Sequence, residues 1–331
     1  MVTRLTDANG SKPNGDHEIS KDEVALYDRQ IRLWGVESQA RLRKASVYVV
    51  GVTATTLEMA KNLVLSGIGR IALHDPREVA AEDLETQYYF GADDVGRPRD
   101  AVLADRLAVL NPLVDVHSTD NTVGAGYDLV VAVGTGGGGD TRLPATRAVN
   151  ARCRDAGVPF IVADAFGLFG YIFADCLDSH QYVEEQPDSA TSDEAVRRLL
   201  CASYKPLDLS CAAAMDIGNV KRAMRKYPPL VFICQALASC ADCHGKQLSE
   251  EELGAIVRQS IQGRGIPDSM VDQGLIGRVA ASWATEYVPC AAVVGGTLAQ
   301  EVLKVVTGKD MPVNNWFAYD ALSGDGIQCC I

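Results

Sequence analysis

The sequence has no excess of basic residues. It carries 31 Lys and Arg against 43 Asp and Glu, a formal net charge of −12 over 331 residues. A charge of this sign argues against a protein that binds nucleic acid or an anionic membrane through its overall field, although it says nothing of a local basic groove. With 47% hydrophobic and 22% charged residues, the composition is that of a soluble chain with a sizeable core, in one large domain or two modest ones.

Two kinds of segment are also missing. We find no basic and apolar leader at the N-terminus and expect no apolar run long enough to cross a bilayer. Without a secretory leader, the ten cysteines are expected to be reduced thiols in the cytosol or nucleus. Residues 1–20 are polar, with glycines and mixed charge, and are expected to form a disordered tail.

The stretch 45–75 has the outline of the first βαβ unit of a nucleotide-binding fold, but its turn lacks glycine. An apolar strand at 46–50 precedes Gly51, a helix runs to Gly67, and a strand at 70–73 leads to Asp75. A working phosphate turn reads G-x-G-x-x-G, because residues without Cβ let backbone N–H groups close on a phosphate. Residues 51–56 instead read GVTATT, so the scaffold is expected to be present and its phosphate cradle blocked.

The rest of the chain predicts a doubly wound, Rossmann-like α/β fold with a mostly helical insertion and antiparallel strands toward the C-terminal half. Helices are expected at 22–44, 101–110, 142–156 and 291–306, the last ended by Gly308. Strands are expected at 114–118, 127–133, 158–163, 167–175, 179–184, 316–320 and 326–330. The expected domains are a tail at 1–20, an adenylation-type domain at 21–185 that closes with 286–331, and a helical insertion at 186–285.

Several residues carry alternative interpretations. Asp75 stands where a Rossmann acid meets a ribose hydroxyl, or it is an ordinary strand-end carboxylate. The glycine run at 134–139 is a weak phosphate-loop candidate or a surface loop. Cys240 and Cys243 have metal-ligand spacing without a second such pair, so they are half of a zinc site or packed cysteines. Cys201, between basic residues, is a weak nucleophile candidate.

Six stretches, in order along the chain, resemble the ubiquitin-like activating enzymes of the ThiF/MoeB adenylation type, and within them the smaller subunits of heterodimeric SUMO-activating enzymes. They read YDRQIRLWG at 27–35, AKNL at 60–63, NPLVDV at 111–116, FGLFGYIFA at 166–174, CAAVVGGTLAQE at 290–301 and NNWFAYD at 314–320. Residues 186–285 match poorly. The resemblance implies that a larger catalytic subunit is the partner and carries ATP, Mg²⁺, the catalytic cysteine and a ubiquitin-fold domain.

For this chain the resemblance implies a pseudo-adenylation subunit that binds no cofactor of its own and reaches SUMO through the complex. Gly51 and Asp75 would be vestiges of a cofactor site, and residues 132–135 read AVGT where the catalytic half of the family has A-L-D-N, with the aspartate that serves metal and ATP. Arg29 of the YDRQ motif would reach into the partner's ATP site, with Arg32 either a second contributor or structural. By spacing alone, these two arginines form an ordinary solvated helix face. The resemblance also implies nuclear residence with some protein in the cytoplasm.

Three alternatives differ in function. The regulatory subunit of a NEDD8-activating enzyme shares much of the pattern but is a longer chain. A self-sufficient homodimeric adenylating enzyme needs the glycine turn and the metal aspartate, and both are missing here. An NAD-dependent oxidoreductase needs the same glycines and a catalytic pair that the sequence does not offer.

Overall fold

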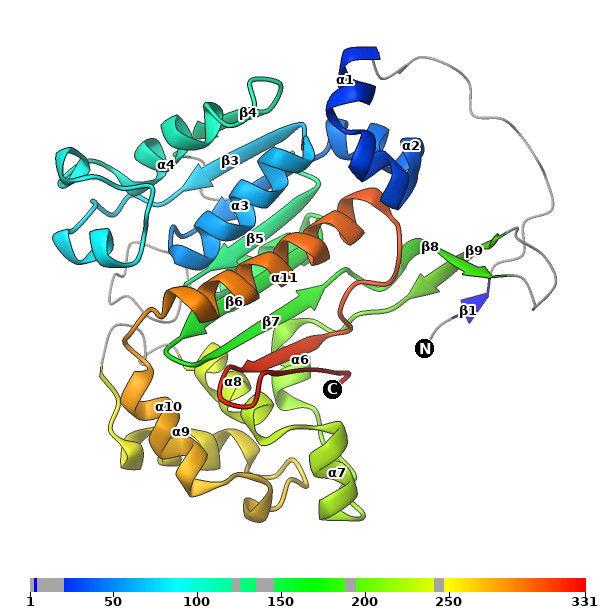
Figure 1. The fold of residues 1–331 in the computed structure, drawn as a ribbon. Helices are drawn as coiled ribbons and strands as arrows, with labels where there is room; N and C mark the ends of the chain where they lie inside the picture. Colours follow the sequence, from blue (N-terminus) through cyan, green and yellow to red (C-terminus); the bar gives the residue numbers. More distant parts are fainter. Residues whose placement is uncertain (1–2, 5–20, 121–125, 135–145, 188–194, 241–246) are drawn as a thin grey trace.

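A single eight-stranded sheet organises the computed structural model, which describes residues 3–4, 21–120, 126–134, 146–187, 195–240 and 247–331. The strand order is β11-β10-β7-β6-β5-β2-β3-β4 (Figure 1). The parallel strands are β2 (Ser46–Val50), β3 (Arg70–His74), β4 (Asp115–Ser118), β5 (Leu129–Val133) and β6 (Phe160–Phe166). The antiparallel strands are β7 (Phe169–Asp175), β10 (Trp316–Asp320) and β11 (Asp325–Cys329).

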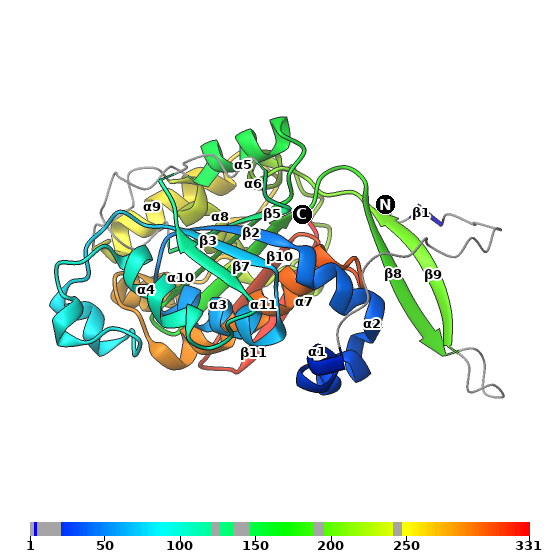
Figure 2. The same ribbon diagram turned by 90° about the horizontal axis from the view of Figure 1, so that it is seen from above.

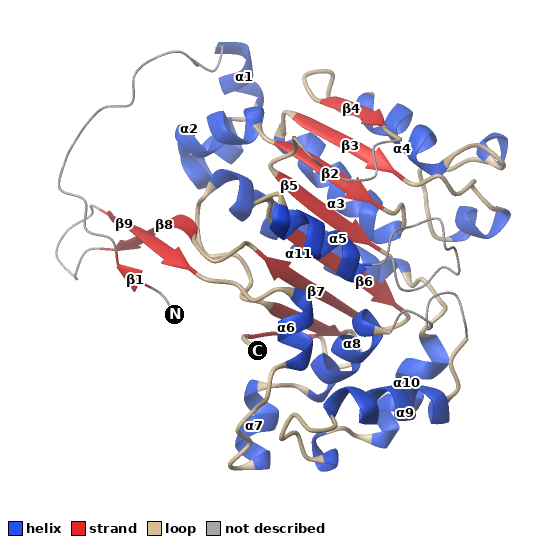
Figure 3. Ribbon diagram, turned by 180° about the vertical axis from the view of Figure 1, so that it is seen from behind, coloured by secondary structure: helices blue, strands red, loops and turns tan. Residues whose placement is uncertain are grey.

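Helices cover both faces of this sheet, which confirms the predicted doubly wound class. One face packs against α3 (Ala54–Ser66), α4 (Arg99–Ala108) and α11 (Val288–Thr307). The opposite face packs against α5 (Thr146–Asp155) and α8 (Pro229–Ser239), as Figures 2 and 3 show. Because both faces are covered, the parallel strands β2 and β5 are buried at every position.

One expectation about apolar runs needs a correction. The 20-residue helix α11 is long and apolar enough, by length and composition alone, to cross a membrane. In the fold it lies beside α3 against the sheet and contributes Val294, Leu298 and Val302 to the core (Figure 1). Its apolar character is that of a buried core helix.

The predicted N-terminal helix is divided. The chain forms α1 (Lys21–Leu26) and α2 (Asp28–Lys44), joined at Tyr27. Within α2, Gly35 has a φ of 86°, which a residue with a side chain rarely adopts, and this kinks the helix. The last turn of α11 ends on Gly308, also in the left-handed conformation, as predicted.

A second, three-stranded sheet corrects two predictions. Its strands are β1 (Thr3–Arg4), β9 (Ala195–Ala202) and β8 (His180–Pro187), in that order. Residues 195–202 were expected to be helical, but in β9 their arginines face the glutamates of β8, with Arg197 opposite Glu185 and Arg198 opposite Glu184. The alternating acidic and basic residues, which in the sequence suggested a charged helix, thus form cross-strand pairs in a hairpin. Thr3–Arg4 is likewise a strand, and the rest of the predicted tail at 1–20 lies outside the described residues.

After β9 the insertion is mostly helical, as predicted. The remaining helices are α6 (Leu207–Ala212), α7 (Val220–Lys226), α9 (Glu250–Ile261) and α10 (Gln273–Ser282), with single turns η1 (Ala81–Glu85), η2 (Ala92–Asp94) and η4 (Asp268–Met270) elsewhere. Together with α8, these longer helices extend the core on the second face of the sheet. The insertion therefore packs directly on the adenylation-type sheet, beside the carboxyl end of β6.

Candidate functional site

Two threonine hydroxyls form hydrogen bonds within the turn that follows β2. Gly51 has a φ of 90°, and its N–H donates to the His74 carbonyl at 3.0 Å. The Thr56 hydroxyl donates to the Gly51 carbonyl at 2.8 Å, and the Thr53 hydroxyl accepts from the Thr56 N–H at 3.4 Å, which caps α3. The Thr53 methyl group also packs against Gly134, where a Cβ would lie 2.1 Å from it. Two threonine side chains thus stand in a turn where the glycine fingerprint has residues without Cβ.

Asp75 is a structural carboxylate in this fold. It is fully buried, and its Oδ2 accepts the Val52 N–H at 2.7 Å. The Arg77 guanidinium donates to both carboxylate oxygens, with an Nε–Oδ1 distance of 2.8 Å and an NH2–Oδ2 distance of 2.6 Å. A carboxylate whose two oxygens are already bound by its own chain is a poor ligand for a ribose hydroxyl. Of the two interpretations left open by the sequence, the geometry favours the strand-end carboxylate.

A glutamate of the same chain binds the N-terminus of α3. Glu286, just before α11, accepts the Ala54 N–H at 3.2 Å through Oε1 and the Thr86 hydroxyl at 3.0 Å through Oε2. A helix N-terminus in this position of the fold attracts a phosphate, because its free N–H groups and dipole favour negative charge. Here the chain's own carboxylate is bound at that point. Burial raises the pKa of Glu286 above its usual value, opposed by the hydrogen bonds from Thr86 and Ala54.

The raised pKa of Glu286 predicts a measurable pH dependence of stability. Because the folded state holds this proton more tightly than the unfolded chain, lowering the pH through the window between the ordinary carboxyl pKa and the raised one stabilises the fold. The free energy of unfolding of the natural chain, minus that of Glu286→Gln, should therefore fall as the pH rises through that window and level off above it. Urea unfolding of both proteins across the acidic range measures this difference. Parallel stability curves would contradict the prediction.

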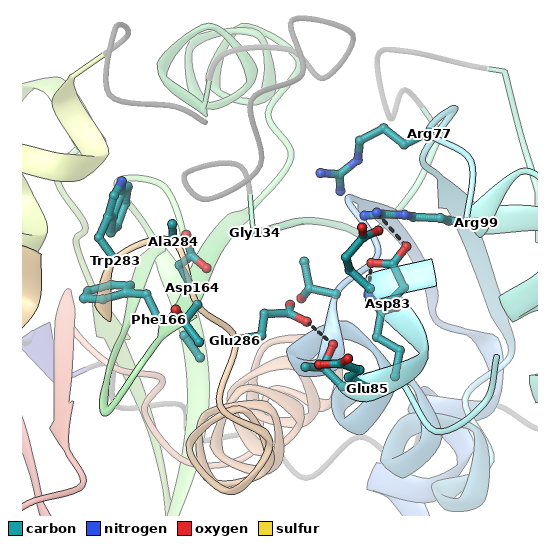
Figure 4. Close-up of a pocket in the computed structure, with 16 residues that line it drawn as sticks. Arg77, Asp83, Glu85, Arg99, Gly134, Asp164, Phe166, Trp283, Ala284 and Glu286 are labelled. Carbon is teal, nitrogen blue, oxygen red and sulfur yellow. Dashed lines mark hydrogen bonds and ion pairs between the residues drawn. The ribbon is translucent and has the colours of Figure 1, made fainter. Parts of the chain in front are cut away.

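Thr53, Arg77 and Glu286 line a cavity of about 620 Å³ at the carboxyl ends of β2, β5 and β6 (Figure 4). Among the described residues, two arginines line it, and both are engaged: Arg77 pairs with Asp75, and Arg99 pairs with Asp83 at 2.7 Å. Five carboxylates line the same cavity, those of Glu82, Asp83, Glu85, Asp164 and Glu286. Among the described lining residues, acidic side chains therefore outnumber basic ones.

The two arginines of the YDRQ motif lie in different local settings. Arg32 is exposed and pairs with Asp28 one turn earlier, with an NH2–Oδ2 distance of 2.9 Å. Arg29 is exposed at the start of α2, and we find no hydrogen bond or ion pair for its guanidinium within the described part of the chain. Its donors are therefore available to a group outside the chain.

Neighbouring residues fix the place of Arg29. The Tyr27 hydroxyl accepts from the Asn111 amide at 2.8 Å, and that amide also donates to the Val64 carbonyl at the end of α3. The Tyr27 ring lies over Gly67, where a Cβ would come within 2.5 Å of the ring. Residues in or next to three of the family-like sequence stretches thus contact one another, and these contacts hold the start of α2 in place.

This contact makes Gly67→Ala destabilising. The new methyl group would overlap the Tyr27 ring, and alanine would have to adopt a φ of 83°. We expect a loss of about 1–3 kcal/mol in the free energy of unfolding. Urea unfolding measures it, and Gly96→Ala is a matched control, because Gly96 has a similar φ of 86° but open space around its Cβ position. Equal losses for the two variants would show that the Tyr27 contact is unimportant.

The remaining sequence candidates do not gather into a site. Cys240 is disulfide-bonded, which corrects the expectation that all cysteines are reduced thiols and removes its sulfur as a zinc ligand. Cys243 and residues 135–139 lie outside the described residues. Cys201 is partly exposed, with its sulfur 3.2 Å from the Ser179 hydroxyl, and nearby Arg197 is paired with Glu185. Within the described ranges, no cluster of three or more His, Cys, Asp or Glu side chains could hold a metal ion.

Several known proteins are similar to this chain in sequence. The ThiF family model matches residues 27–330. The chain is 32% identical to SUMO-activating enzyme subunit 1 of Rattus norvegicus and 30% identical to subunit 1B-1 of Arabidopsis thaliana, covering 95% of this chain in both cases and 95% and 97% of those proteins. It is 28% identical to the DNA damage tolerance protein RHC31 of Saccharomyces cerevisiae over 93% of this chain and 96% of that protein.

Among solved structures, the crystal structure of selenomethionine PaaA superposes with a TM-score of 0.56. The superposition covers 96% of this chain and 76% of PaaA at 15% sequence identity, which shows a shared fold alone. The family model, by contrast, spans nearly the whole chain from the YDRQ motif to the last strand. The chain belongs to the ThiF family.

Proposed function

We propose that this chain is the regulatory subunit of a heterodimeric SUMO-activating enzyme and has no adenylation activity of its own. Its relatives at about 30% identity over 95% of the chain carry the name SUMO-activating enzyme subunit 1, a name that implies a second subunit. One observation supports the absence of activity most directly: the Glu286 carboxylate is bound to the α3 N-terminus, where a phosphate would bind.

ATP and Mg²⁺ would accordingly belong to the catalytic partner subunit. The proposal is supported by the blocked turn at Thr53 and Thr56, the internal Asp75–Arg77 pair and the acidic lining of the cavity. Without a backbone cradle and a metal carboxylate, a site binds a triphosphate poorly. None of these features favours the oxidoreductase or the self-sufficient adenylating enzyme considered above.

Arg29 would be this chain's contribution to the chemistry. Adenylation brings the SUMO C-terminal carboxylate against the ATP α-phosphate and builds negative charge there. An exposed guanidinium with unengaged donors, held in place by the Tyr27–Asn111 contact, can stabilise that charge in the partner's site. Because Arg32 already pairs with Asp28, it fits a secondary or structural role.

The surface around Arg29 fits a partner interface. Large apolar side chains are exposed on α1, α2 and the end of α3, namely Leu26, Leu33, Val36 and Leu65. Figure 1 shows α1 and α2 together at one end of the molecule, next to the end of α11. Burial of such side chains against a second subunit would bring Arg29 to that subunit. Nuclear residence with some cytoplasmic protein remains a prediction from the resemblance.

ATP–pyrophosphate exchange stimulated by SUMO tests this function. We expect no exchange with this chain alone and full exchange when it is mixed with the catalytic subunit. Exchange by this chain alone would overturn the proposal that it is inactive. NEDD8 in place of SUMO should give no exchange with the mixture, and stimulation by NEDD8 instead of SUMO would assign the chain to the other activating enzyme.

A further inference from the structure

One helix of the insertion presents charge of a single sign to solvent. The outer face of α7 carries four exposed basic side chains, which we call the α7 basic patch: Lys221, Arg222, Arg225 and Lys226. The other face of α7 is apolar and packs, half-buried, against the core through Val220, Ala223, Met224 and Tyr227. Because the whole chain has a net charge of −12, this patch is a local exception on an acidic protein.

The charges of the α7 basic patch are not neutralised within the chain. None of its four side chains forms an ion pair with another residue in the part of the chain that the structure describes. The turn η4 contacts α7, but its exposed Asp268 is not paired with them either. Lys226 instead lies over the Tyr227 ring, 4.9 Å from its centroid. The basic residue in the last turn of α4, Arg106, by contrast pairs with Asp94 at 2.9 Å.

The placement of these charges weakens the helix that carries them. Lys221 and Arg222 lie in the first turn of α7, where the helix dipole favours acidic residues, and that turn has none. Lys221 with Arg225, and Arg222 with Lys226, are four residues apart, a spacing at which like charges repel. A hydrogen bond to Tyr227 raises the pKa of Lys226, and the charge of Arg222 opposes that rise. Residues that oppose the local structure are expected at functional surfaces.

The size and surroundings of the patch restrict what it can bind. With seven residues, α7 is about 10 Å long, which matches a few successive residues of a peptide. A long nucleic acid would extend over the acidic remainder of the protein, which repels it, and the four side chains of the patch include no aromatic ring on which a base could stack. Guanidinium and ammonium groups bind carboxylates through charge-assisted hydrogen bonds. The chemistry therefore fits an acidic peptide.

We propose that the α7 basic patch is a docking site for an acidic segment of a protein other than the partner subunit. Carboxylates of that segment neutralise both like-charge pairs of the helix. Figures 1 and 3 show α7 at the end of the molecule opposite α1 and α2, so a partner subunit that covers the surface around Arg29 leaves the patch accessible. This inference goes beyond the proposed function and does not depend on it.

Fluorescence anisotropy of labelled hexaglutamate, titrated with the full chain, tests the inference. We expect saturable binding at low ionic strength that weakens at least about tenfold at physiological salt, because exposed charges are screened. Labelled hexaglutamine, which has no charge, should not bind. A DNA duplex of about two helical turns should bind more weakly than hexaglutamate. The proposal is overturned by absent binding of hexaglutamate, by equal binding of hexaglutamine, or by tighter binding of the duplex.

A charge reversal locates the binding to α7. Arg222→Glu should weaken hexaglutamate binding at least about tenfold, because it replaces an attractive charge by a repulsive one. It should not lower the midpoint of urea unfolding, because it puts an acid in the first turn and opposite Lys226 one turn later. Weaker binding together with an undiminished midpoint therefore cannot come from unfolding. A lower midpoint would contradict the argument that the charges of α7 oppose its helix.

A matched reversal controls for the overall charge. Lys44→Glu changes the charge of the chain by the same amount at an exposed position on α2, at the opposite end of the molecule. It should leave hexaglutamate binding almost unchanged, because the distance from α7 exceeds the screening length at physiological salt. Equal losses with Arg222→Glu and Lys44→Glu would show that the peptide does not bind at α7.

Repeating the titration on the assembled heterodimer separates this inference from the proposed function. Hexaglutamate should bind the heterodimer as it binds the free chain. Loss of binding in the heterodimer would show that the partner subunit covers α7 and would overturn a docking site for another protein. Failure of the SUMO-stimulated exchange would overturn the proposed function and leave the titration result standing, so the two hypotheses fail separately.

Discussion

Replacing Arg29 by alanine is expected to reduce SUMO adenylation by the heterodimer about 30- to 1,000-fold, which corresponds to about 2–4 kcal/mol in the barrier. Loss of one preorganised donor to a developing negative charge has this size in enzymes that stabilise charge through fixed hydrogen bonds. Folding and dimerisation should be unaffected, because Arg29 is exposed and makes no hydrogen bond or ion pair with the described residues of its own chain. Exchange of pyrophosphate at saturating ATP and SUMO measures the effect on the chemical step.

Three companion variants sharpen this prediction. Arg29→Lys keeps the charge but loses the planar fork of donors, so it should recover only part of the activity. Arg32→Ala should have a small effect, because the Arg32 guanidinium is held by Asp28. Lys44→Ala removes an exposed positive charge from the far end of α2 and controls for the loss of charge alone. Normal exchange by the Arg29→Ala heterodimer would show that Arg29 takes no part in adenylation.

Much of the fold could be predicted from the sequence because its elements depend on local patterns. The apolar runs of β2 and β5, and the helix that ends on Gly308, are strong signals of buried strands and a core helix. Strand β8 was predicted at 179–184, but its partner β9 was missed because the charges of the two strands pair across the hairpin. From the sequence alone, Glu184 and Glu185 followed later by Arg197 and Arg198 are equally typical of solvated helices.

The candidate site could be predicted only in part. The threonines of the first turn predicted a blocked phosphate cradle, and in the structure the Thr56 hydroxyl bonds within that turn while Thr53 packs against Gly134. No local sequence pattern predicted the role of Glu286, which accepts a hydrogen bond from the Ala54 N–H, 232 residues away in the sequence. The contact exists because α11 packs beside α3, and only the three-dimensional fold brings the residue before one helix to the N-terminus of the other.

Replacing Asp75, which follows β3, by alanine should strongly destabilise the chain. The substitution leaves the Arg77 guanidinium, which is 7% exposed, without its carboxylate in a buried setting, and it removes the acceptor of the Val52 N–H. Removing one partner of a buried ion pair costs about 3–5 kcal/mol in the free energy of unfolding. Urea unfolding of the isolated chain measures the loss. Asp75→Asn, which keeps the shape and one acceptor oxygen, should lose less.

A second replacement separates the cost of burying the Arg77 charge without Asp75 from the favourable energy of the pair itself. In the double variant Asp75→Ala/Arg77→Met, no buried charge remains, so most of the stability lost in Asp75→Ala should return. If the double variant is instead as unstable as Asp75→Ala, the hydrogen bond to Val52 is the main contribution of Asp75. If Asp75 were a ribose ligand, its loss would weaken nucleotide binding by the chain and leave stability almost unchanged. A stable Asp75→Ala chain would therefore contradict the structural role, and with it the proposal that the chain itself occupies the ligand positions of this site.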